Sequence, residues 1–516
     1  MDTIAILDFG SQTTQLIARR IRELGVYSEI FPGTVAAGKL PGDDLRGIVL
    51  SGSPWSVHDE DAGAPDPALY DLDVPILGIC YGLQRMTHDL GGEVARTAGR
   101  EYGRARLQYD REHPLFAHIP EGSIAWMSHG DSVQAAPDGW KVVARSEYGA
   151  PACIADSSRR RVGIQFHPEV SHCEYGMRVL ENFVFGICGA ARSWTVDEYL
   201  EQGVREIRST VGSEPVVLLI SGGVDSSVVA ALLLKALPAE QVYLIYVDTG
   251  LMRRDETAEV EHALRAFGAQ HLSVIDASEE FLGELAGVGD PEEKRRIIGD
   301  LFMTVQQREV ESRVPGTYFL AQGTLYTDMI ESGKGVGGHA KVIKSHHNVR
   351  SPLVEQKRAE GRIVEPLAHL YKDEVRKLGA ALGLPASTIG RHPFPGPGLA
   401  VRILGEVSAE KCDILRAADA IYIEELRARG LYDKIWQAFA VLLPIRAVGV
   451  AGDAREYGYV VALRAVHSID GMTADVYPFE SHDILEISAR ITNEVPAVGR
   501  VVYDVSSKPP ATIEWE

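Results

Sequence analysis

Val216-Val-Leu-Leu-Ile-Ser-Gly-Gly-Val-Asp-Ser-Ser-Val-Val-Ala230 is the stretch that decides the fold of this chain. The apolar run Val216–Ile220 predicts a buried parallel strand, and Val228–Leu237 predicts an apolar helix. Ser221-Gly222-Gly223 separates the two, so that free backbone N–H groups and the positive end of the helix dipole face one point. No lysine follows in the GxxxxGK[ST] spacing, which excludes the Walker loop that grips a γ-phosphate. The stretch therefore predicts a different kind of anion-binding loop.

The sequence Ser-Gly-Gly-Val-Asp-Ser-Ser of this loop resembles the pyrophosphate loop of the ATP pyrophosphatases. Enzymes of that class cleave ATP between its α and β phosphates. The alternative is a plain glycine turn between a strand and a helix. The resemblance implies that a substrate of this protein is adenylylated. The ATP-binding residues that it implies are Ser221, Gly222, Gly223, Val224, Asp225, Ser226 and Ser227.

The sequence around this loop predicts a doubly wound α/β domain with a parallel sheet. Three further apolar runs alternate with helical segments: Val242–Val247, Leu272–Ile275 and Tyr318–Ala321. Nucleotides bind beyond the carboxyl ends of the strands in such sheets, which adds Val247, Asp248 and Gly323 to the predicted ATP site. Asp225 is a candidate Mg²⁺ ligand, because ATP needs a cation to neutralise its phosphates. A solvated helix cap is the alternative role for Asp225.

Composition limits the other classes of function. The 516 residues are too many for one core, and 45% hydrophobic with 24% charged residues is ordinary for a soluble globular protein. No apolar run approaches the ~18 to 20 residues of a membrane span. The net charge of −20 disfavours a nucleic-acid-binding surface. Five scattered cysteines without CxxC spacing favour the reducing cytoplasm over a disulfide framework or a zinc site.

The first 190 residues contain a candidate cysteine nucleophile. Pro75-Ile-Leu-Gly-Ile-Cys80-Tyr-Gly-Leu-Gln84 predicts a buried strand that turns sharply into a helix, with Gly-x-Cys-x-Gly at the turn. The helix N-terminus favours the thiolate of Cys80. Further along, His167 would take the thiol proton and Glu169 would fix the imidazole tautomer, as in a catalytic triad. Alternatively, Cys80 is an inert core residue and His167-Pro-Glu169 is a turn.

Taken together, these passages resemble the class I glutamine amidotransferases, and the resemblance covers residues 1 to 188. It implies an α/β domain in which Cys80 attacks the side-chain amide of glutamine and releases ammonia. Ser51-Gly52-Ser53-Pro54 then supplies Gly52 N–H to the oxyanion hole, together with Tyr81 N–H. Gln84 and Asp131 are implied to lie near the bound glutamine.

A glycine- and lysine-rich stretch runs from Glu331 to Asn348. Its Gly333-x-Gly335-x-x-Gly338 spacing matches a dinucleotide fingerprint, but no strand leads into it and no apolar helix follows, so we reject that interpretation. We expect a lid, carrying Lys341 and Lys344, that closes over phosphates. A disordered surface loop is the alternative.

Over its full length the chain resembles the glutamine-hydrolysing GMP synthetase family. Beyond the two domains, His392-Pro-Phe-Pro-Gly-Pro-Gly398, Asp470-Gly-Met-Thr-Ala-Asp475 and Ser507-Lys508-Pro-Pro-Ala-Thr-Ile513-Glu514-Trp-Glu516 carry the resemblance. It implies three domains: a class I amidotransferase (1–190), an ATP pyrophosphatase (191–391) and a small α+β domain (392–516) that dimerises and completes the site for xanthosine monophosphate (XMP). The sequence departs from the family at Arg350-Ser-Pro-Leu, where Gly-Gly-Leu-Pro is usual. The XMP-binding residues that it implies are Arg296 (or its neighbour Arg295), Asp328, Glu331, Lys344, Arg500, Lys508, Ile513 and Glu514.

The reaction that the resemblance implies uses glutamine, Mg-ATP and XMP. The XMP O2 oxygen attacks the α-phosphorus, and ammonia then displaces AMP from C2 to give GMP. Two rival hypotheses are a NAD or asparagine synthetase and a catalytically inactive binding protein on the same scaffold. Asparagine synthetases need an N-terminal cysteine, whereas Asp2 follows Met1 here. Release of AMP with all substrates present distinguishes an enzyme from the inactive scaffold.

Overall fold

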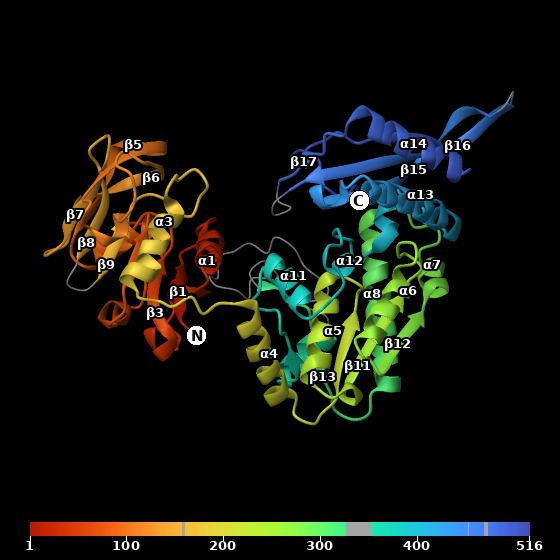
Figure 1. The fold of residues 1–516 in the computed structure, drawn as a ribbon, viewed down its shortest axis with the longest axis horizontal. Coiled ribbons are helices and arrows are strands. Elements are labelled where there is room, and N and C mark those ends of the chain that lie inside the picture. Colours follow the sequence, from red (N-terminus) through yellow and green to blue (C-terminus); the bar gives the residue numbers. More distant parts are fainter. Residues whose placement is uncertain (157–159, 327–351, 452–453, 469–472) are drawn as a thin grey trace. The chain divides into compact units, whose positions relative to one another are not determined.

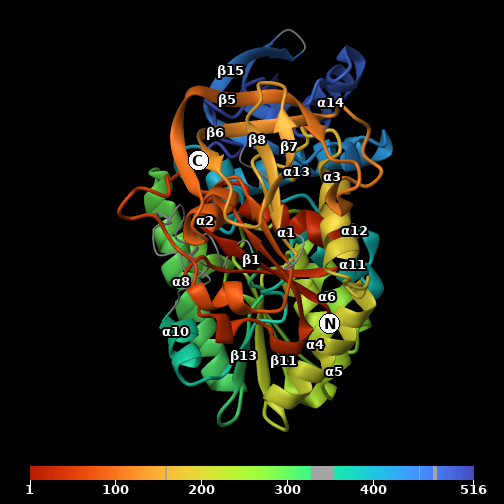
Figure 2. The same cartoon turned by 90° about the vertical axis from the view of Figure 1, so that its left-hand side faces the viewer.

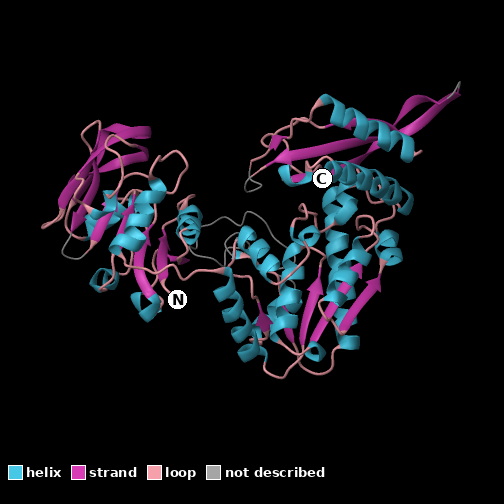
Figure 3. Cartoon of the chain, viewed as in Figure 1, coloured by secondary structure: helices cyan, strands magenta, loops and turns pink. Residues whose placement is uncertain are grey.

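The structure is a computed structural model of residues 1–516, and it describes all of them except 157–159, 327–351, 452–453 and 469–472. It divides into two compact units, one formed by the described residues of 1–199 together with Tyr326 and the other by the described residues of 200–325 and 352–516 (Figure 1). Both units contain helices and strands (Figure 3). Within the described residues, we find no helix with the length and apolar character that a bilayer crossing requires.

The first unit is built on a nine-stranded mixed sheet with the strand order β2-β1-β3-β4-β9-β8-β7-β5-β6. The five strands from β2 to β9 pair in parallel, and the remaining pairs are antiparallel. Its helices are α1 (Thr14–Glu23), α2 (Tyr81–Asp89) and α3 (Gly176–Glu181). Its strands are β1 (Thr3–Asp8), β2 (Tyr27–Pro32), β3 (Leu45–Leu50), β4 (Ile76–Ile79), β5 (Glu93–Tyr109), β6 (Ile124–Ala135), β7 (Lys141–Ser146), β8 (Pro151–Asp156) and β9 (Arg161–Ile164).

The second unit begins within α4 (Val196–Val211) and contains a five-stranded parallel sheet. Its strand order, β12-β11-β10-β13-β14, is that of a doubly wound fold with β10 at the centre. The strands are β10 (Val216–Ile220), β11 (Val242–Asp248), β12 (His271–Asp276), β13 (Phe319–Ala321) and β14 (Ile363–Val364). The helices that accompany this sheet are α5 (Val224–Ala236), α6 (Glu256–Ala266), α7 (Ser278–Glu284), α8 (Pro291–Arg313), α10 (Pro352–Ala359), α11 (Lys372–Ala381) and α12 (Ala386–Ile389).

Helices cover both faces of this sheet (Figure 2). On one face, Val217 and Leu320 pack against Val310 of α8 and Val354 of α10. On the other face, α5 lies against β10 and is itself covered by α11. Burial on both faces explains why β10 is a continuous apolar run without alternation.

The C-terminal part of the second unit adds a four-stranded sheet and two long helices. The strands are β15 (Gln437–Ala451), β16 (Ala454–His467), β17 (Asp475–Val476) and β18 (Val498–Tyr503), and the helices are α13 (Ala409–Ala428) and α14 (Ser481–Glu494). One hydrophobic core joins α8 to α13 and to the inner face of β15 and β16. The predicted fold class is thereby confirmed: α/β throughout, with a parallel doubly wound sheet followed by a small α+β part.

The helix predicted at Val228–Leu237 begins four residues earlier than expected. α5 starts at Val224, directly after Gly223, which is its N-cap. Polar residues at a helix start do not interrupt it, because the first turn exposes N–H groups that polar side chains can contact. Asp225, Ser226 and Ser227 therefore belong to the first helical turn and do not precede it.

Candidate active sites

Cys80 lies on a sharp turn between β4 and α2. Its φ of 52° and ψ of −104° are values that residues other than glycine rarely adopt. The flanking glycines permit the turn, since a Cβ on Gly78 would come within 2.6 Å of the Gly82 backbone, and one on Gly82 within 2.3 Å of Leu50 O. Backbone strain of this kind costs about 1–3 kcal/mol and is typical of functional positions. The turn presents the thiol at the N-terminus of α2.

His167 and Glu169 lie beside this cysteine. His167 Nδ1 is 2.7 Å from Glu169 Oε1, and the side chains are only 11% and 0% exposed. Burial alone would lower the pKa of His167, but hydrogen bonds and charge interactions with Cys80 and Glu169 outweigh it and raise the pKa to about 10. The imidazole is therefore protonated at neutral pH. That arrangement suits a thiolate–imidazolium pair.

The two predicted oxyanion-hole residues lie next to catalytic candidates: Tyr81 follows Cys80 in the chain, and Gly52 lies near His167. Tyr81 is the first residue of α2, where backbone N–H groups are not used within the helix. A Cβ on Gly52 would lie 3.2 Å from Ser11 Oγ and 3.5 Å from His167 Cε1. A side chain at position 52 would therefore press on the Ser11 hydroxyl and reach contact distance of the His167 imidazole.

Gln84 and Asp131, predicted to bind glutamine, contact each other. Gln84 is buried, and its Nε2 donates to the Asp131 carbonyl at 2.8 Å. The Asp131 carboxylate accepts a hydrogen bond from Ser56 Oγ at 2.5 Å, on the chain that follows Gly52. Gln84 thus fixes the strand that carries Asp131. The Asp131 carboxylate contacts the segment that follows the predicted oxyanion loop.

The sequence analysis missed Gln165, which contacts the thiol directly. Its Nε2 lies 3.7 Å from Cys80 Sγ, and its Oε1 accepts a hydrogen bond from Gln84 Nε2 at 3.4 Å. The available signal was position, because Gln165 stands two residues before His167 and directly follows β9.

In the second unit, the predicted pyrophosphate loop joins β10 to α5. Its hydroxyl groups contact one another: Ser221 Oγ lies 3.2 Å from Ser226 Oγ, and Ser226 and Ser227 both donate to the Gly223 carbonyl. Gly222 has a φ of +76°, which a residue with a side chain would adopt only under strain. The loop is thus a folded cradle at a helix N-terminus, the geometry that favours phosphate binding.

Lys372, also missed in the sequence analysis, forms an ion pair with this loop. Its Nζ lies 2.6 and 2.7 Å from the two carboxylate oxygens of Asp225. Lys372 is the first residue of α11, 147 positions along the chain. It thus brings a positive charge to the predicted phosphate site. No short sequence motif marks it.

The other predicted ATP-binding residues lie at the carboxyl ends of neighbouring strands. Gly323 stands two residues after the end of β13. A Cβ added to it would lie 3.3 Å from Asp225 Cβ. Val247 and Asp248 end β11, which pairs with β10 in parallel. The Asp248 carboxylate accepts hydrogen bonds from Gly250 N and Thr257 Oγ1, so it organises the loop after β11.

Glu514, predicted to bind XMP, is held by two residues that the sequence analysis missed. The fully buried Arg402 donates from Nε at 3.1 Å and from Nη2 at 2.8 Å to the two Glu514 oxygens. Gln437 Nε2 donates to Glu514 Oε1 at 2.7 Å. Arg402 also lies over the ring of Phe439, with its guanidinium carbon 4.1 Å from the ring centre. Glu514 is therefore rigidly oriented.

A second buried arginine orders the segment that leads to Glu514. Arg464 donates to the carbonyls of Ser506 and Thr512 at 2.5 and 3.1 Å. Ile513 is buried in an apolar cluster with Phe439 and other strand residues. Lys508 pairs with Ala474 through backbone hydrogen bonds. Arg500 is exposed on β18.

The structure does not bring Arg296 to the residues that surround Glu514. Arg296 is 60% exposed and pairs with Glu293 and Asp300 on its own helix, α8. Its neighbour Arg295 instead donates to the Glu516 carbonyl at 2.5 Å. The helical turn explains the difference, because adjacent residues on a helix point about 100° apart. Asp328, Glu331 and Lys344, together with the predicted lid, lie outside the described residues.

Fold and site together define a class of protein: a glutamine amidotransferase joined to an ATP-dependent adenylating domain. The family model "Glutamine amidotransferase class-I" matches residues 5–187, "Asparagine synthase" matches 195–290, and "GMP synthase C terminal domain" matches 424–515. Proteins described as GMP synthase [glutamine-hydrolyzing] from Aquifex aeolicus and Solidesulfovibrio magneticus are each 52% identical, covering 99% and 100% of this chain and 99% of their own. The Geobacillus kaustophilus relative is 51% identical over 100% of this chain and 99% of its own.

The chain belongs to the family of glutamine-hydrolysing GMP synthases. It is therefore an enzyme, and its amidotransferase and ATP pyrophosphatase domains fit glutamine-dependent GMP synthesis. Among solved structures, a glutamine amidotransferase from Thermotoga maritima is 21% identical, covering 40% of this chain and 84% of its own, with a TM-score of 0.28.

Proposed function

We propose that this enzyme converts XMP to GMP, using ammonia from glutamine and energy from ATP, and that the residues described above carry out the reaction. The full-length match to relatives named glutamine-hydrolysing GMP synthases carries this proposal, since it spans both sites and the C-terminal part. The asparagine synthase model matches only 195–290, which holds the pyrophosphate loop and no amide-handling residue. An asparagine synthetase is therefore the weaker candidate.

The amidotransferase half works by covalent catalysis. The Cys80 thiolate attacks the carbonyl carbon of the glutamine side chain, and the N–H groups of Gly52 and Tyr81 stabilise the oxyanion. His167 then gives its proton to the departing nitrogen, so that the C–N bond breaks and ammonia leaves. Water hydrolyses the resulting thioester and releases glutamate. The buried His167–Glu169 pair supports this role, because a protonated imidazole is the acid that the leaving nitrogen needs.

The adenylation half works by positioning and charge. XMP O2 attacks the α-phosphorus of ATP, and the P–O bond to pyrophosphate breaks. The loop 221–227 and the Lys372 ammonium stabilise the charge that develops on pyrophosphate. Ammonia then attacks C2 of the adenylated XMP, and AMP departs. Gly323, Val247 and Asp248 line the ATP site at the carboxyl end of the sheet.

Mg²⁺ is the metal that we assign to this reaction. Among the residues that the structure describes, no cluster of three or more His, Cys, Asp or Glu side chains could hold a metal ion by itself. Mg²⁺ in ATP sites usually takes one or two carboxylates and completes its shell with phosphates and water. Asp225 fits that role, since its carboxylate has lone pairs beyond the two bonds from Lys372. The ion would supply charge neutralisation at the phosphates.

We assign XMP to the C-terminal part of the second unit. Glu514 would bind the base, and the cations Lys508 and Arg500 the nucleotide phosphate. The fixed orientation of Glu514 supports this assignment, because base recognition needs a carboxylate held in one place. Ile513 would close the base pocket. Arg295 replaces Arg296 in our assignment, since it alone of the two reaches Glu516. Asp328, Glu331 and Lys344 remain predictions.

The proposal also includes three domains, divided at 190/191 and 391/392, a homodimer and a cytoplasmic location. The β15–β16 hairpin exposes apolar side chains, among them Ile445 (55%), Val450 (77%) and Tyr457 (63%). Such a patch is typical of a protein interface and supports dimerisation through the C-terminal part.

All five cysteines lie in the described part of the chain, and none forms a disulfide. That finding favours a reducing compartment.

Formation of GMP and AMP from XMP, Mg-ATP and either glutamine or ammonium tests the proposed function. We expect one AMP per GMP with both nitrogen sources. If neither nitrogen source gives GMP, the acceptor is wrong. If GMP formed per glutamine hydrolysed stays far below one at saturating XMP and ATP, the two halves do not act as one enzyme.

A further inference from the structure

We propose that residues 391–393 form a bridge that positions Gln437, and through it the proposed XMP-binding residue Glu514, relative to the pyrophosphate loop. The bridge lies wholly within the second unit. The inference rests on the proposed function, because it describes how the ATP and XMP parts of one site are held together.

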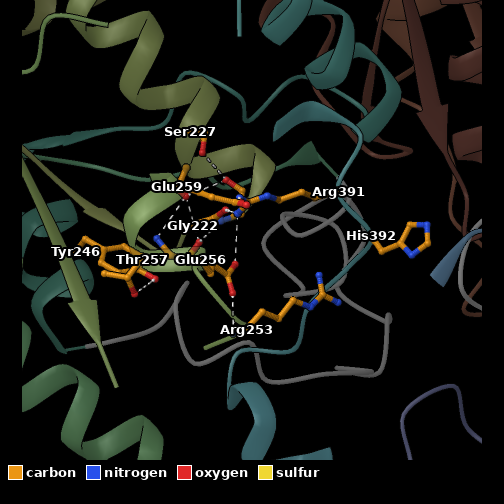
Figure 4. A network of polar contacts seen from close by, with 12 residues as sticks. Gly222, Ser227, Tyr246, Arg253, Glu256, Thr257, Glu259, Arg391 and His392 are labelled. Atoms are coloured by element: carbon orange, nitrogen blue, oxygen red, sulfur yellow. Dashed lines mark hydrogen bonds and ion pairs between the residues drawn. The ribbon is translucent and has the colours of Figure 1, made fainter. Parts of the chain in front are cut away.

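Arg391 is the end of the bridge at the ATP site. Its Nη1 donates to the Gly222 carbonyl at 3.3 Å and lies 3.4 Å from Glu256 Oε1, and its Nη2 pairs with Glu259. Figure 4 shows the guanidinium directed into this network, between the loop and α6. The Arg391 side chain is only 13% exposed and that of Glu256 only 8%. A buried charged donor therefore holds the backbone of the pyrophosphate loop.

The carbonyl that Arg391 contacts belongs to Gly222, where the surrounding side chains leave no room for a larger residue. A Cβ on Gly222 would lie 3.2 Å from Val260 Cγ2 and 3.5 Å from Tyr246 Cε2. Glu256 also accepts a hydrogen bond from Arg253 N, which ties the start of α6 to the same network. Rotation of the Gly222 carbonyl would turn the Gly223 N–H with it, because the two belong to one planar peptide unit. Arg391 thus fixes the Gly222–Gly223 peptide, which leads directly into α5.

His392, the middle of the bridge, is fixed to the C-terminal sheet and points away from Arg391 (Figure 4). Its Nδ1 accepts a hydrogen bond from Ala438 N at 3.1 Å, and its Nε2 lies 3.0 Å from the Tyr432 carbonyl. Its ring stacks on the Tyr432 ring at 3.8 Å. These bonds place the proton on Nε2, and burial lowers the pKa of His392 to about 4, so the ring is neutral.

The far end of the bridge contacts Gln437 and, through it, Glu514. Gln437 stands next to Ala438 on β15, and its Nε2 donates both to the Pro393 carbonyl at 3.1 Å and to Glu514 Oε1 at 2.7 Å. Arg391 therefore contacts the pyrophosphate loop, and His392 contacts strand β15. Pro393 contacts the Gln437 amide that orients Glu514. A shift of one site would be transmitted to the other through a chain of direct contacts.

Arg391 is accordingly a positioning residue for the adenylation step. Its loss should weaken the alignment of ATP and XMP without touching the amidotransferase chemistry. Arg391→Met tests this, because the cleft beneath the guanidinium is lined by the apolar side chains of Ala231, Leu264, Phe267 and Leu384 and can accept a methionine. Arg391→Lys keeps the charge but cannot contact Gly222 and both carboxylates at once. Glu259→Gln is the matched control, since Glu259 is 58% exposed and leaves the Gly222 and Glu256 contacts in place.

The readouts are the ammonium-dependent kcat and KM for ATP and XMP, exchange of labelled pyrophosphate into ATP in the presence of XMP, and glutaminase activity. We expect Arg391→Met to lower kcat/KM for ATP and the exchange rate by roughly 10- to 100-fold, the effect of one buried hydrogen bond to a charged group. Arg391→Lys should recover part of the loss. Glu259→Gln should stay within about twofold of wild type, and glutaminase should be unchanged in all three.

A double variant tests the bridge itself. Arg391→Met and Gln437→Ala should together lose less than the product of their separate losses, because each breaks the same chain of contacts. Fully multiplicative losses, or wild-type exchange rates in Arg391→Met, would overturn the inference. If wild type forms no GMP, the proposed function fails. The bridge is then judged by affinity for a non-hydrolysable ATP analogue, which Arg391→Met should still weaken and Glu259→Gln should not. Equal affinity in all three proteins would overturn it.

Discussion

The two candidate catalytic groups differ in what their polar atoms contact. In the first unit, the parts needed for chemistry are already paired in their working arrangement: Cys80 is held in a strained turn, and His167 is bonded to Glu169. In the second unit, the groups that would receive phosphate contact each other, as in the Ser221–Ser226 and Asp225–Lys372 pairs.

This difference follows from the chemistry of each half. A covalent nucleophile has to be oriented before its substrate arrives, and strain stored in a rigid elbow achieves that. A phosphate cradle has to stabilise charge that only the substrate brings, so its ammonium pairs with a carboxylate and its hydroxyls with each other until phosphate replaces those partners. We therefore expect substitutions in the first group to abolish one activity, and substitutions in the second to weaken the whole reaction by degrees.

The largest expected effect is that of Cys80→Ala. Without the thiol no thioester forms, so the glutamine-dependent rate should fall by about 10⁴-fold or more, while the ammonium-dependent rate should stay within about twofold. GMP formation with each nitrogen source measures both. Cys153→Ala, at another buried cysteine of the same unit, is the control for loss of a core thiol. An equal loss with both nitrogen sources would mean that the two halves are not separable.

Lys372→Met should give the next largest effect. Because the ammonium neutralises charge at the pyrophosphate loop, we expect kcat to fall by about 10²- to 10³-fold with glutamine and with ammonium alike. Lys377→Met, on the same helix and 67% exposed, is the control and should leave both rates unchanged. A loss confined to the glutamine reaction would contradict a role at the phosphate loop.

A smaller effect separates two neighbouring arginines. Arg295→Ala should raise the KM for XMP by roughly tenfold, because Arg295 fixes the segment that carries Glu514. Arg296→Ala should change it by less than about twofold, since Arg296 only forms exposed pairs on α8. Steady-state kinetics with ammonium measures both. The reverse result would restore Arg296 as the XMP-binding residue.

The two candidate sites also show how much of the structure the sequence predicts. The strands that end in Cys80 and in the pyrophosphate loop are predicted to within a residue or two, because complete burial makes each a continuous apolar run and glycines mark where it ends. Strands β5 and β6 escaped prediction, since many of their described side chains alternate between core and solvent and charged residues interrupt the apolar pattern.

Residues that act across the fold were beyond prediction for a different reason. Lys372 meets Asp225 only after 147 residues, and no local spacing records such a pairing. Arg402 and Arg464 are fully buried, whereas sequence alone favours exposure of arginine. Each is stabilised inside by several hydrogen bonds that exist only once the C-terminal segment has folded against β15 and β16.

The smallest expected effect is in the pH dependence of the amidotransferase half. Contacts in the folded protein favour the charged form of His167, which raises its pKa from 6.5 to about 10. The stabilisation from this charge is therefore fully present below about pH 6.5 and is lost as the pH rises toward 10. Over pH 7 to 9 the imidazole remains mostly protonated, so the glutaminase rate at saturating substrates should vary by less than about threefold. The ammonium-dependent rate at fixed total ammonium should instead rise steeply over the same range, since only unprotonated ammonia attacks C2. If the glutaminase rate titrates near pH 6.5, the imidazole is not held in an ion pair, and the contrast between a preformed first site and an adaptable second site no longer holds.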